Sequence, residues 1–86
     1  MHAFGYPTSV TKEGTDYVVT VRDLPPVVTA GDSEAEAWEL AADAIEVVVA
    51  YAIDRGLEIS APSPPRDGET VIPLSAYLAA KLAARR

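Results

Sequence analysis

The sequence predicts a small α+β domain in which one long helix packs on a mostly antiparallel sheet, in the order β-β-β-α-β-α. Apolar and polar residues alternate through Tyr17–Val21, which is typical of a strand with one buried face. The segment Ser33–Arg55 instead carries polar residues three or four apart along one stripe, which is typical of a helix. Prolines and glycines separate these segments and mark the turns between them.

The first two strands are expected to form an antiparallel hairpin. Tyr6–Lys12 contains four residues that favour strands, and Lys12–Asp16 is a polar, glycine-containing segment suited to a hairpin loop. Asp23–Pro26 ends the second strand, because its two prolines lack the N–H groups that a sheet requires. Val27–Ala30 is then expected to be a third short strand.

The long helix has clear start and stop signals. After a turn at Gly31, Ser33 and Glu36 form an S-x-x-E capping box, which satisfies two backbone donors at a helix start. Gly56 stands where a left-handed cap ends a helix. The polar positions of this helix form a single acidic stripe, made of Glu36, Glu39, Asp43, Glu46 and Asp54.

The apolar arc of the helix is wider than one face of a small sheet needs. Trp38 lies on this arc with Ile45 and Ala52, so we expect its side chain to be in the core. The excess apolar surface indicates that another part of the fold, or another subunit, covers the rest of the helix.

Beyond the helix, Ala61–Gly68 contains three prolines and is expected to be an extended connection. Glu69–Pro73 has the residues of a short fourth strand. Leu74–Arg86 regains helical spacing, with leucines four residues apart and Ser75 as a candidate cap.

Length and composition limit the class of protein. Eighty-six residues form one domain that buries only about 60% of its unfolded surface, so a partner subunit is expected to help it. The chain has no cysteine and a single histidine, His2, which excludes disulfides and thiolate metal sites. Met1–Val10 lacks the pattern of a signal peptide, and the longest apolar run, Val47–Ile53, is too short to span a membrane. We therefore expect a soluble, cytoplasmic protein.

The net charge of −6 argues against simple binding to nucleic acid, which requires lysine and arginine against the phosphates. It favours a basic partner, or serves solubility alone.

The evidence for catalysis is weak. Asp16, Asp23 and Asp32 lie near predicted strand ends, but turn and cap roles account for them, and a hydrolytic metal site needs several converging carboxylates. Ser33 has no histidine or lysine placed to activate it. We predict no enzymatic activity, no cofactor and no metal.

The motifs, taken in order, resemble the HicB-like antitoxin family over roughly residues 6 to 83. The residues that carry the resemblance are Tyr6-Pro7, Tyr17–Val19, Asp23-Leu24-Pro25, Thr29–Ser33, Glu36-Ala37, Ala41–Ile45 and Ala61–Ser63. The resemblance implies a partial RNase H-like fold that lacks ribonuclease chemistry. Pro26 and Val27 depart from it, since a Gly-Cys pair is common there.

The resemblance also implies a partner: HicA, a small basic toxin that cleaves messenger RNA, whose catalytic histidine and RNA-binding face the antitoxin covers. On this basis residues 1–73 are expected to form the toxin-binding domain and residues 74–86 a C-terminal helix. The hypothetical binding surface runs from the turn after the second strand to the acidic stripe, and comprises Asp23, Leu24, Pro25, Glu36, Glu39, Asp43 and Glu46.

Assembly and DNA binding are separate questions. We expect a homo-oligomer, a dimer or tetramer, with the third strand or Leu74–Leu82 as the contact. Longer members of the family carry a ribbon-helix-helix or helix-turn-helix that binds their own promoter. No such unit follows here, so DNA binding is left open.

Two other functions compete with the antitoxin. One is a HicB-fold oligomeric scaffold, or ligand-binding domain, without a toxin partner. The other is an RNase H-type nuclease, which the lack of clustered carboxylates disfavours.

Overall fold

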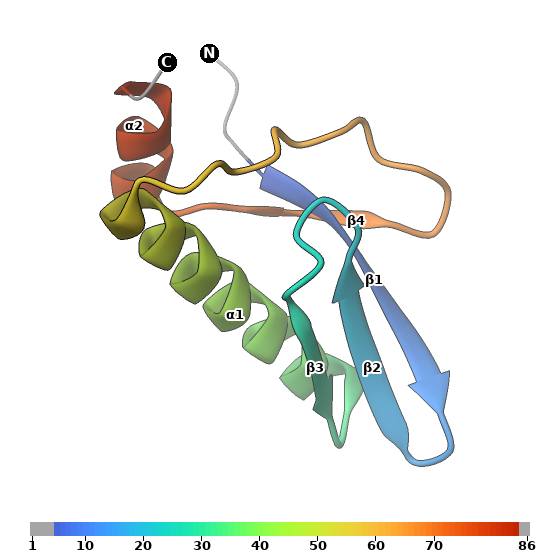
Figure 1. The fold of residues 1–86 in the computed structure, drawn as a ribbon. Helices are drawn as coiled ribbons and strands as arrows, with labels where there is room; N and C mark the ends of the chain where they lie inside the picture. Colours follow the sequence, from blue (N-terminus) through green and yellow to red (C-terminus); the bar gives the residue numbers. More distant parts are fainter. Residues whose placement is uncertain (1–4, 85–86) are drawn as a thin grey trace.

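The computed structural model describes residues 5–84, and these confirm the predicted α+β fold. The elements in chain order are β1 (Gly5–Glu13), β2 (Asp16–Val21), β3 (Val28–Gly31), α1 (Glu34–Arg55), β4 (Thr70–Pro73) and α2 (Ala76–Ala84) (Figure 1). Among the described residues, no helix is both long enough and apolar enough to cross a membrane.

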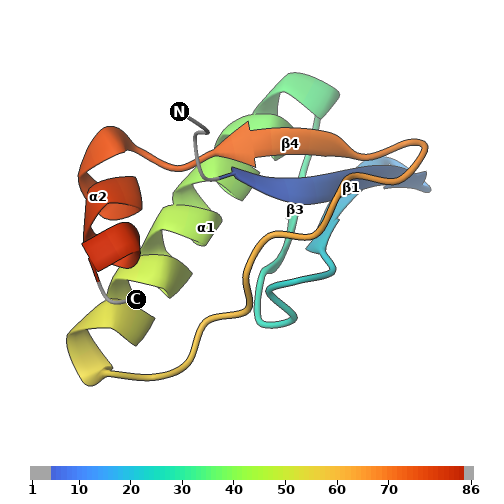
Figure 2. The same cartoon turned by 90° about the horizontal axis from the view of Figure 1, so that it is seen from above.

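The four strands form one antiparallel sheet in the order β3-β2-β1-β4. The register places Thr8 opposite Val21 and Val10 opposite Val19, so these side chains share the face that α1 covers. The chain runs from β3, at one edge of the sheet, into helix α1. It then returns to the opposite edge of the sheet as β4 (Figure 2). The connection after α1 must therefore pass the end of the sheet.

Several strand boundaries differ from the prediction by one residue, and two of these shifts have a clear physical reason. The hairpin loop shrinks to Gly14 and Thr15, with Gly14 at φ 63°, because Glu13 and Asp16 already pair across the ladder. The third strand begins one residue late, since the N–H of Val27 donates to the carbonyl of Leu24 at 2.9 Å and this turn draws Val27 into the core.

The core consists of two clusters of buried side chains. The larger lies between the sheet, α1 and α2, and comprises Tyr6, Val21, Leu24, Val27, Ile45, Val49, Leu74 and Leu78. The smaller joins Val19 to Ala37 and Ala41 at the start of α1. Gly31 makes this close approach possible, since a Cβ on it would lie 2.8 Å from the backbone nitrogen of Ala37. Gly31 thus ends β3 and allows the start of α1 to pack directly against it.

The prediction that Trp38 lies in the core is wrong. Its side chain is only partly buried and belongs to neither core cluster. The stripe that faces the sheet instead runs through Ala37, Ala41 and Ile45. Small alanines let the helix backbone approach the strands closely, which a tryptophan on that face would prevent.

Both predicted caps of α1 are confirmed. The hydroxyl of Ser33 accepts a hydrogen bond from the N–H of Glu36 at 3.1 Å, and the Glu36 carboxylate accepts from the N–H of Asp32 at 2.7 Å. At the other end, Gly56 adopts φ 66°, and its N–H reaches the carbonyls of Ala52 and Ile53.

The predicted cap of the C-terminal helix, Ser75, is confirmed, and the helix begins two residues after the start of the predicted helical spacing. It begins at Ala76, where Ser75 Oγ accepts a hydrogen bond from the N–H of Leu78 at 3.3 Å. Leu78 is buried with Leu74, so the apolar side of α2 is already used within the fold. Arg85 and Arg86, at the end of the predicted helical segment, lie outside the described residues, as does His2.

We expect Ser33→Ala to lower the free energy of unfolding by about 1 kcal/mol, because the N–H of Glu36 loses its acceptor. Chemical denaturation followed by circular dichroism measures the loss. Ser33→Asp is the matched control and should cost little, since its carboxylate keeps an oxygen acceptor at this cap position. Equal losses for the two variants would show that the acceptor contributes little.

Candidate functional site

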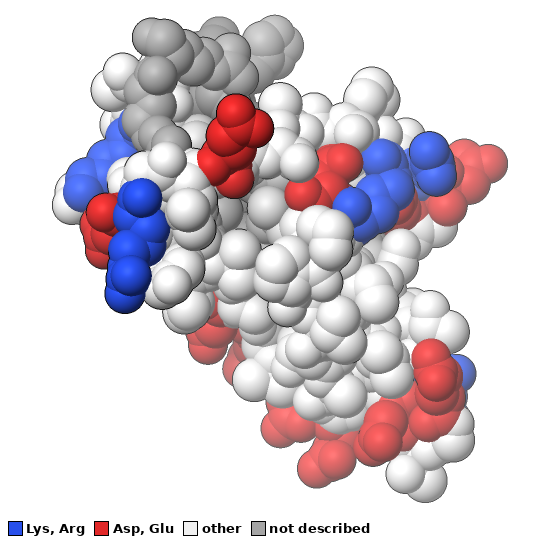
Figure 3. Space-filling view, in the orientation of Figure 1, with Lys and Arg blue, Asp and Glu red and all other residues white. Residues whose placement is uncertain are grey.

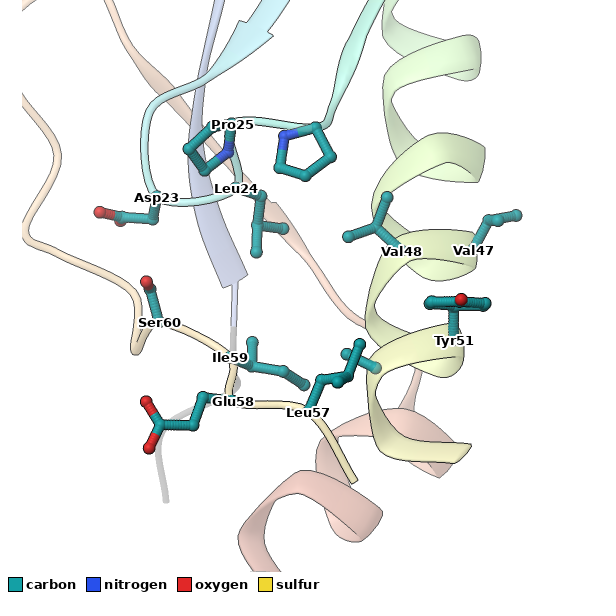
Figure 4. Close-up of a pocket in the computed structure, with 12 residues that line it drawn as sticks. Asp23, Leu24, Pro25, Val47, Val48, Tyr51, Leu57, Glu58, Ile59 and Ser60 are labelled. Atoms are coloured by element: carbon teal, nitrogen blue, oxygen red, sulfur yellow. The ribbon is translucent and has the colours of Figure 1, made fainter. Parts of the chain in front are cut away.

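An apolar groove opens between the turn after β2 and the second half of α1 (Figure 4). Its volume is about 410 Å³. Leu24, Pro25 and Pro26 line it on the side of the turn. The remaining walls are Val47, Val48, Tyr51 and Ala52 from α1, and Leu57–Ser60 from the start of the connection to β4. Nearly all these side chains are apolar, so the groove is suited to bind an apolar group.

The helix wall of the groove is exposed because the sheet covers a different side of α1. Val47 is 67% exposed and Tyr51 is 53% exposed, although both are large apolar residues. They are four residues apart and therefore lie on the same side of the helix. Arg55 lies over the Tyr51 ring, 5.0 Å from its centroid, at the end of this stripe.

The opposite wall is held in place by hydrogen bonds between residues distant in sequence. The Asp23 carboxylate accepts from the N–H of Ser63 at 2.7 Å and from its hydroxyl at 2.8 Å. The Tyr6 hydroxyl donates to the carbonyl of Ser60 at 2.8 Å. Burial first, and then the charge of Asp23, raise the pKa of Tyr6, which keeps this donor protonated. The groove is consequently formed before any ligand arrives.

A paired arginine and glutamate hold the same connection further along the chain. Nε and Nη2 of Arg22 donate to the two carboxylate oxygens of Glu69, both at 2.9 Å, and Nη2 also reaches the carbonyl of Pro64 at 2.7 Å. The bond from Arg22 and the N–H of Arg66 lower the pKa of the Glu69 carboxyl. Such a two-pronged contact fixes orientation as well as distance.

The three predicted residues of the turn, Asp23, Leu24 and Pro25, differ in how far they are buried. Asp23 is partly buried, and its carboxylate is engaged with Ser63. Leu24 is only 4% exposed and belongs to the core, although it reaches the floor of the groove. Pro25 is exposed at the groove's edge. Of the three, only Pro25 is exposed to solvent.

The predicted acidic residues lie on one side of α1, away from the sheet. Glu36, Glu39 and Asp43 are exposed, whereas Glu46 is partly buried and accepts a hydrogen bond from the N–H of Ser75 at 2.8 Å. Carboxylates gather over this side of α1 and over the hairpin end of the sheet, beside a broad uncharged surface (Figure 3). Because Ser75 directly precedes α2, its hydrogen bond to Glu46 also helps to hold α2 in place.

Val47, Tyr51, Leu57 and Ile59 form much of the groove, yet the predicted binding surface omits them. One signal was present in the sequence, since Val47 and Tyr51 extend the helix's apolar arc beyond what a sheet covers. The part played by Leu57 and Ile59 had no local signal, because it depends on the path of the connection.

Within residues 5–84, no group of three histidine or acidic side chains is placed to hold a metal ion. The arrangement that does stand out is an apolar groove beside a row of carboxylates. Surfaces of this kind are more typical of protein-binding modules than of enzymes.

Comparison with known proteins identifies the family. Residues 5–83 match the family model described as the HicB-like antitoxin of bacterial toxin–antitoxin systems. The chain therefore belongs to the HicB-like antitoxin family, as its motifs predicted.

The chain is similar to "Antitoxin HicB 2" of Photorhabdus laumondii subsp. laumondii, with 31% identity over 77 residues. This alignment covers 90% of the chain but 54% of the relative, so the chain spans about half the length of the curated relative it matches. The fold is similar to the crystal structure of the N-terminal domain of the Burkholderia pseudomallei antitoxin HicB, with a TM-score of 0.63 and 24% identity. That match covers 84% of this chain and 96% of the other.

The lowered pKa of Glu69 makes the stability of the connection depend on pH. A carboxyl whose pKa is lower in the folded state stabilises the fold above its unfolded pKa, and this stabilisation is lost as pH falls through the folded value. We expect Glu69→Gln to lower the Tm at neutral pH, and the difference from the unmodified protein to shrink below the ordinary pKa of 4.5. Thermal melts across this range measure the effect.

Glu39→Gln is the control, because it removes one negative charge from exposed helix surface and breaks no hydrogen bond that the structure shows. A Tm difference for Glu69→Gln that stayed constant down to about pH 3 would contradict the assignment.

Proposed function

We propose that this chain is an antitoxin that binds and neutralises a small, basic, HicA-like toxin and has no catalytic activity of its own. The match of residues 5–83 to the HicB-like antitoxin family carries this proposal. The net charge of −6 and the carboxylates beside an apolar groove support a basic protein partner.

The proposed roles of the predicted site residues follow from their surroundings. Exposed Glu39 and Asp43 attract the partner, since charges at the rim of an interface mainly set the rate of association. Pro25 would contact the partner at the edge of the groove, and exposed Glu36, in the first turn of α1, would add to the attraction. Asp23, Leu24 and Glu46 act indirectly, because each is engaged in holding the fold together.

A second candidate is a ligand-binding domain without a toxin partner. One observation favours it: the groove's volume of about 410 Å³ lies within the range of small-molecule sites. The toxin assay below separates the two functions, because a ligand-binding domain would leave toxin activity unchanged.

We further propose that the chain acts in the cytoplasm, and that its strands adopt the partial RNase H-like arrangement known for the family. Residues 1–73 would form the toxin-binding domain. Residues 74–86 would be the C-terminal segment that contains α2, and its Leu74 and Leu78 pack into the core of that domain. The lack of cysteine is compatible with a reducing compartment.

The assay that tests the proposal mixes the purified chain with a HicA-like protein, which the antitoxin role predicts to be encoded beside its gene, and follows cleavage of RNA. We expect cleavage to stop at equimolar antitoxin, and the association rate to fall as salt increases, because opposite charges guide the encounter. Bovine serum albumin, another acidic protein, is the control for charge alone. Cleavage that persists with excess chain, and no complex on a sizing column, would refute the antitoxin role.

We also propose that two copies associate through the edge strand β3. Val28 on this strand is 66% exposed, whereas the apolar side of α2 is already buried. Sedimentation equilibrium at micromolar concentration should give the mass of a dimer or tetramer, and Val28→Lys should lower it, because lysine on an edge opposes strand pairing. Val71→Lys, on the other edge strand, is the matched control. The mass of a single chain for the unmodified protein would contradict self-association.

A further inference from the structure

The strongest unassigned feature is the groove between α1 and the connection. We propose that it receives a large apolar side chain from a basic segment of the partner protein, with the Tyr51 ring as the principal contact. This inference rests on the proposed function, since it names the surface with which this chain would hold its toxin.

The shape and chemistry of the groove indicate an apolar occupant. Its volume of about 410 Å³ is more than twice that of a cavity of about 150 Å³ that accepts benzene, so one or two large side chains fit. Val47 and Tyr51 leave much of their apolar surface in water at its mouth (Figure 4). Covering that surface is favourable, and tyrosines in such positions are frequently the main contributors to binding.

The residues that line the groove should also lose little conformational entropy on binding, because both walls are already held in place. The Ser60 and Ser63 bonds to Tyr6 and Asp23 position the connection that forms one wall. The other wall is a continuous helix. A surface that needs no ordering keeps more of its contact energy as affinity.

The charges around the groove decide which partner fits. Glu58 borders it on the side of the connection, and Asp43 lies one helical turn before Val47. Asp23 borders the turn, but its carboxylate is already bound to Ser63 and lies 3.7 Å from the guanidinium of Arg22. The guanidinium of Arg55 opposes these carboxylates, and it lies over the Tyr51 ring at the end of the groove. A second copy of this acidic chain would bring more carboxylates to the site. A basic segment, in which lysine or arginine flanks an apolar side chain, complements it.

Two tyrosines provide a matched test. Tyr51 lies in the groove, whereas Tyr77 lies on α2; they are 53% and 67% exposed, and each carries a cationic side chain over its ring. Binding of the purified HicA-like protein is measured by calorimetry and by dissociation kinetics. We expect Tyr51→Ala to raise Kd at least about tenfold, mainly through faster dissociation, and Tyr77→Ala to leave it unchanged. Thermal melts check that both variants fold.

Two further variants test the chemistry of the occupant. Val47→Asp places a carboxylate on an exposed position of the apolar wall, so it should weaken binding without unfolding the chain. Glu58→Lys should slow association several-fold at low salt, and the effect should vanish near 1 M salt. An unchanged association rate would show that the bound segment is not basic.

The outcomes separate the two proposals. If the unmodified chain binds the toxin and the two tyrosine variants behave alike, the groove is not the contact, although the antitoxin role stands. If the unmodified chain does not bind the toxin, both proposals fail. If Tyr51→Ala instead abolishes self-association while toxin binding is kept, a second copy fills the groove and this inference is overturned.

Discussion

The hydrogen bonds between Asp23 and Ser63 are the constraint on which much of the structure depends. The chain leaves α1 on one side and must reach β4 at the far edge of the sheet, through a proline-rich segment with little secondary structure. Ordering such a segment costs conformational entropy, which local contacts do not recover. A carboxylate that accepts two hydrogen bonds, together with the Arg22–Glu69 pair, offsets this cost and brings β4 to its place beside β1.

The same constraint creates the groove. With Ser60 bound to Tyr6 and Ser63 bound to Asp23, the connection passes beside α1, and an apolar groove lies between Leu57–Ile59, the turn and the helix. The groove is therefore a consequence of how the chain solves a topological problem. Its permanence is useful for binding, because a preformed site needs no reorganisation.

Helix α1 serves three different surfaces at once. Ala37, Ala41 and Ile45 pack on the sheet, Val47 and Tyr51 line the groove, and the acidic stripe faces solvent. The apolar part of the α1 circumference is wider than the sheet covers. This is why a chain of 86 residues carries more apolar surface than its own core buries. The arrangement separates the two parts of recognition, since the carboxylates act at a distance and the groove acts on contact.

The sequence by itself determined the order of elements, both caps of α1, the charge balance and the family. The caps rest on residues that are near neighbours in the chain, Ser33 with Glu36 and Gly56 with the last helical turn, and the charge balance and family rest on the composition and on the order of short motifs. These interactions are decided within a few residues, and so a pattern in the sequence can reveal them.

The tertiary structure alone decided which stripe of α1 faces the sheet, that Leu24 is buried, and that a groove exists. The helix offers two overlapping apolar stripes, and the choice between Trp38 and Ala37 depends on how closely β3 and Gly31 approach. The groove depends on hydrogen bonds that join residues 40 to 54 positions apart, from Asp23 to Ser63 and from Tyr6 to Ser60. No local pattern encodes contacts at that separation, because they form only when the whole sheet and helix are packed together.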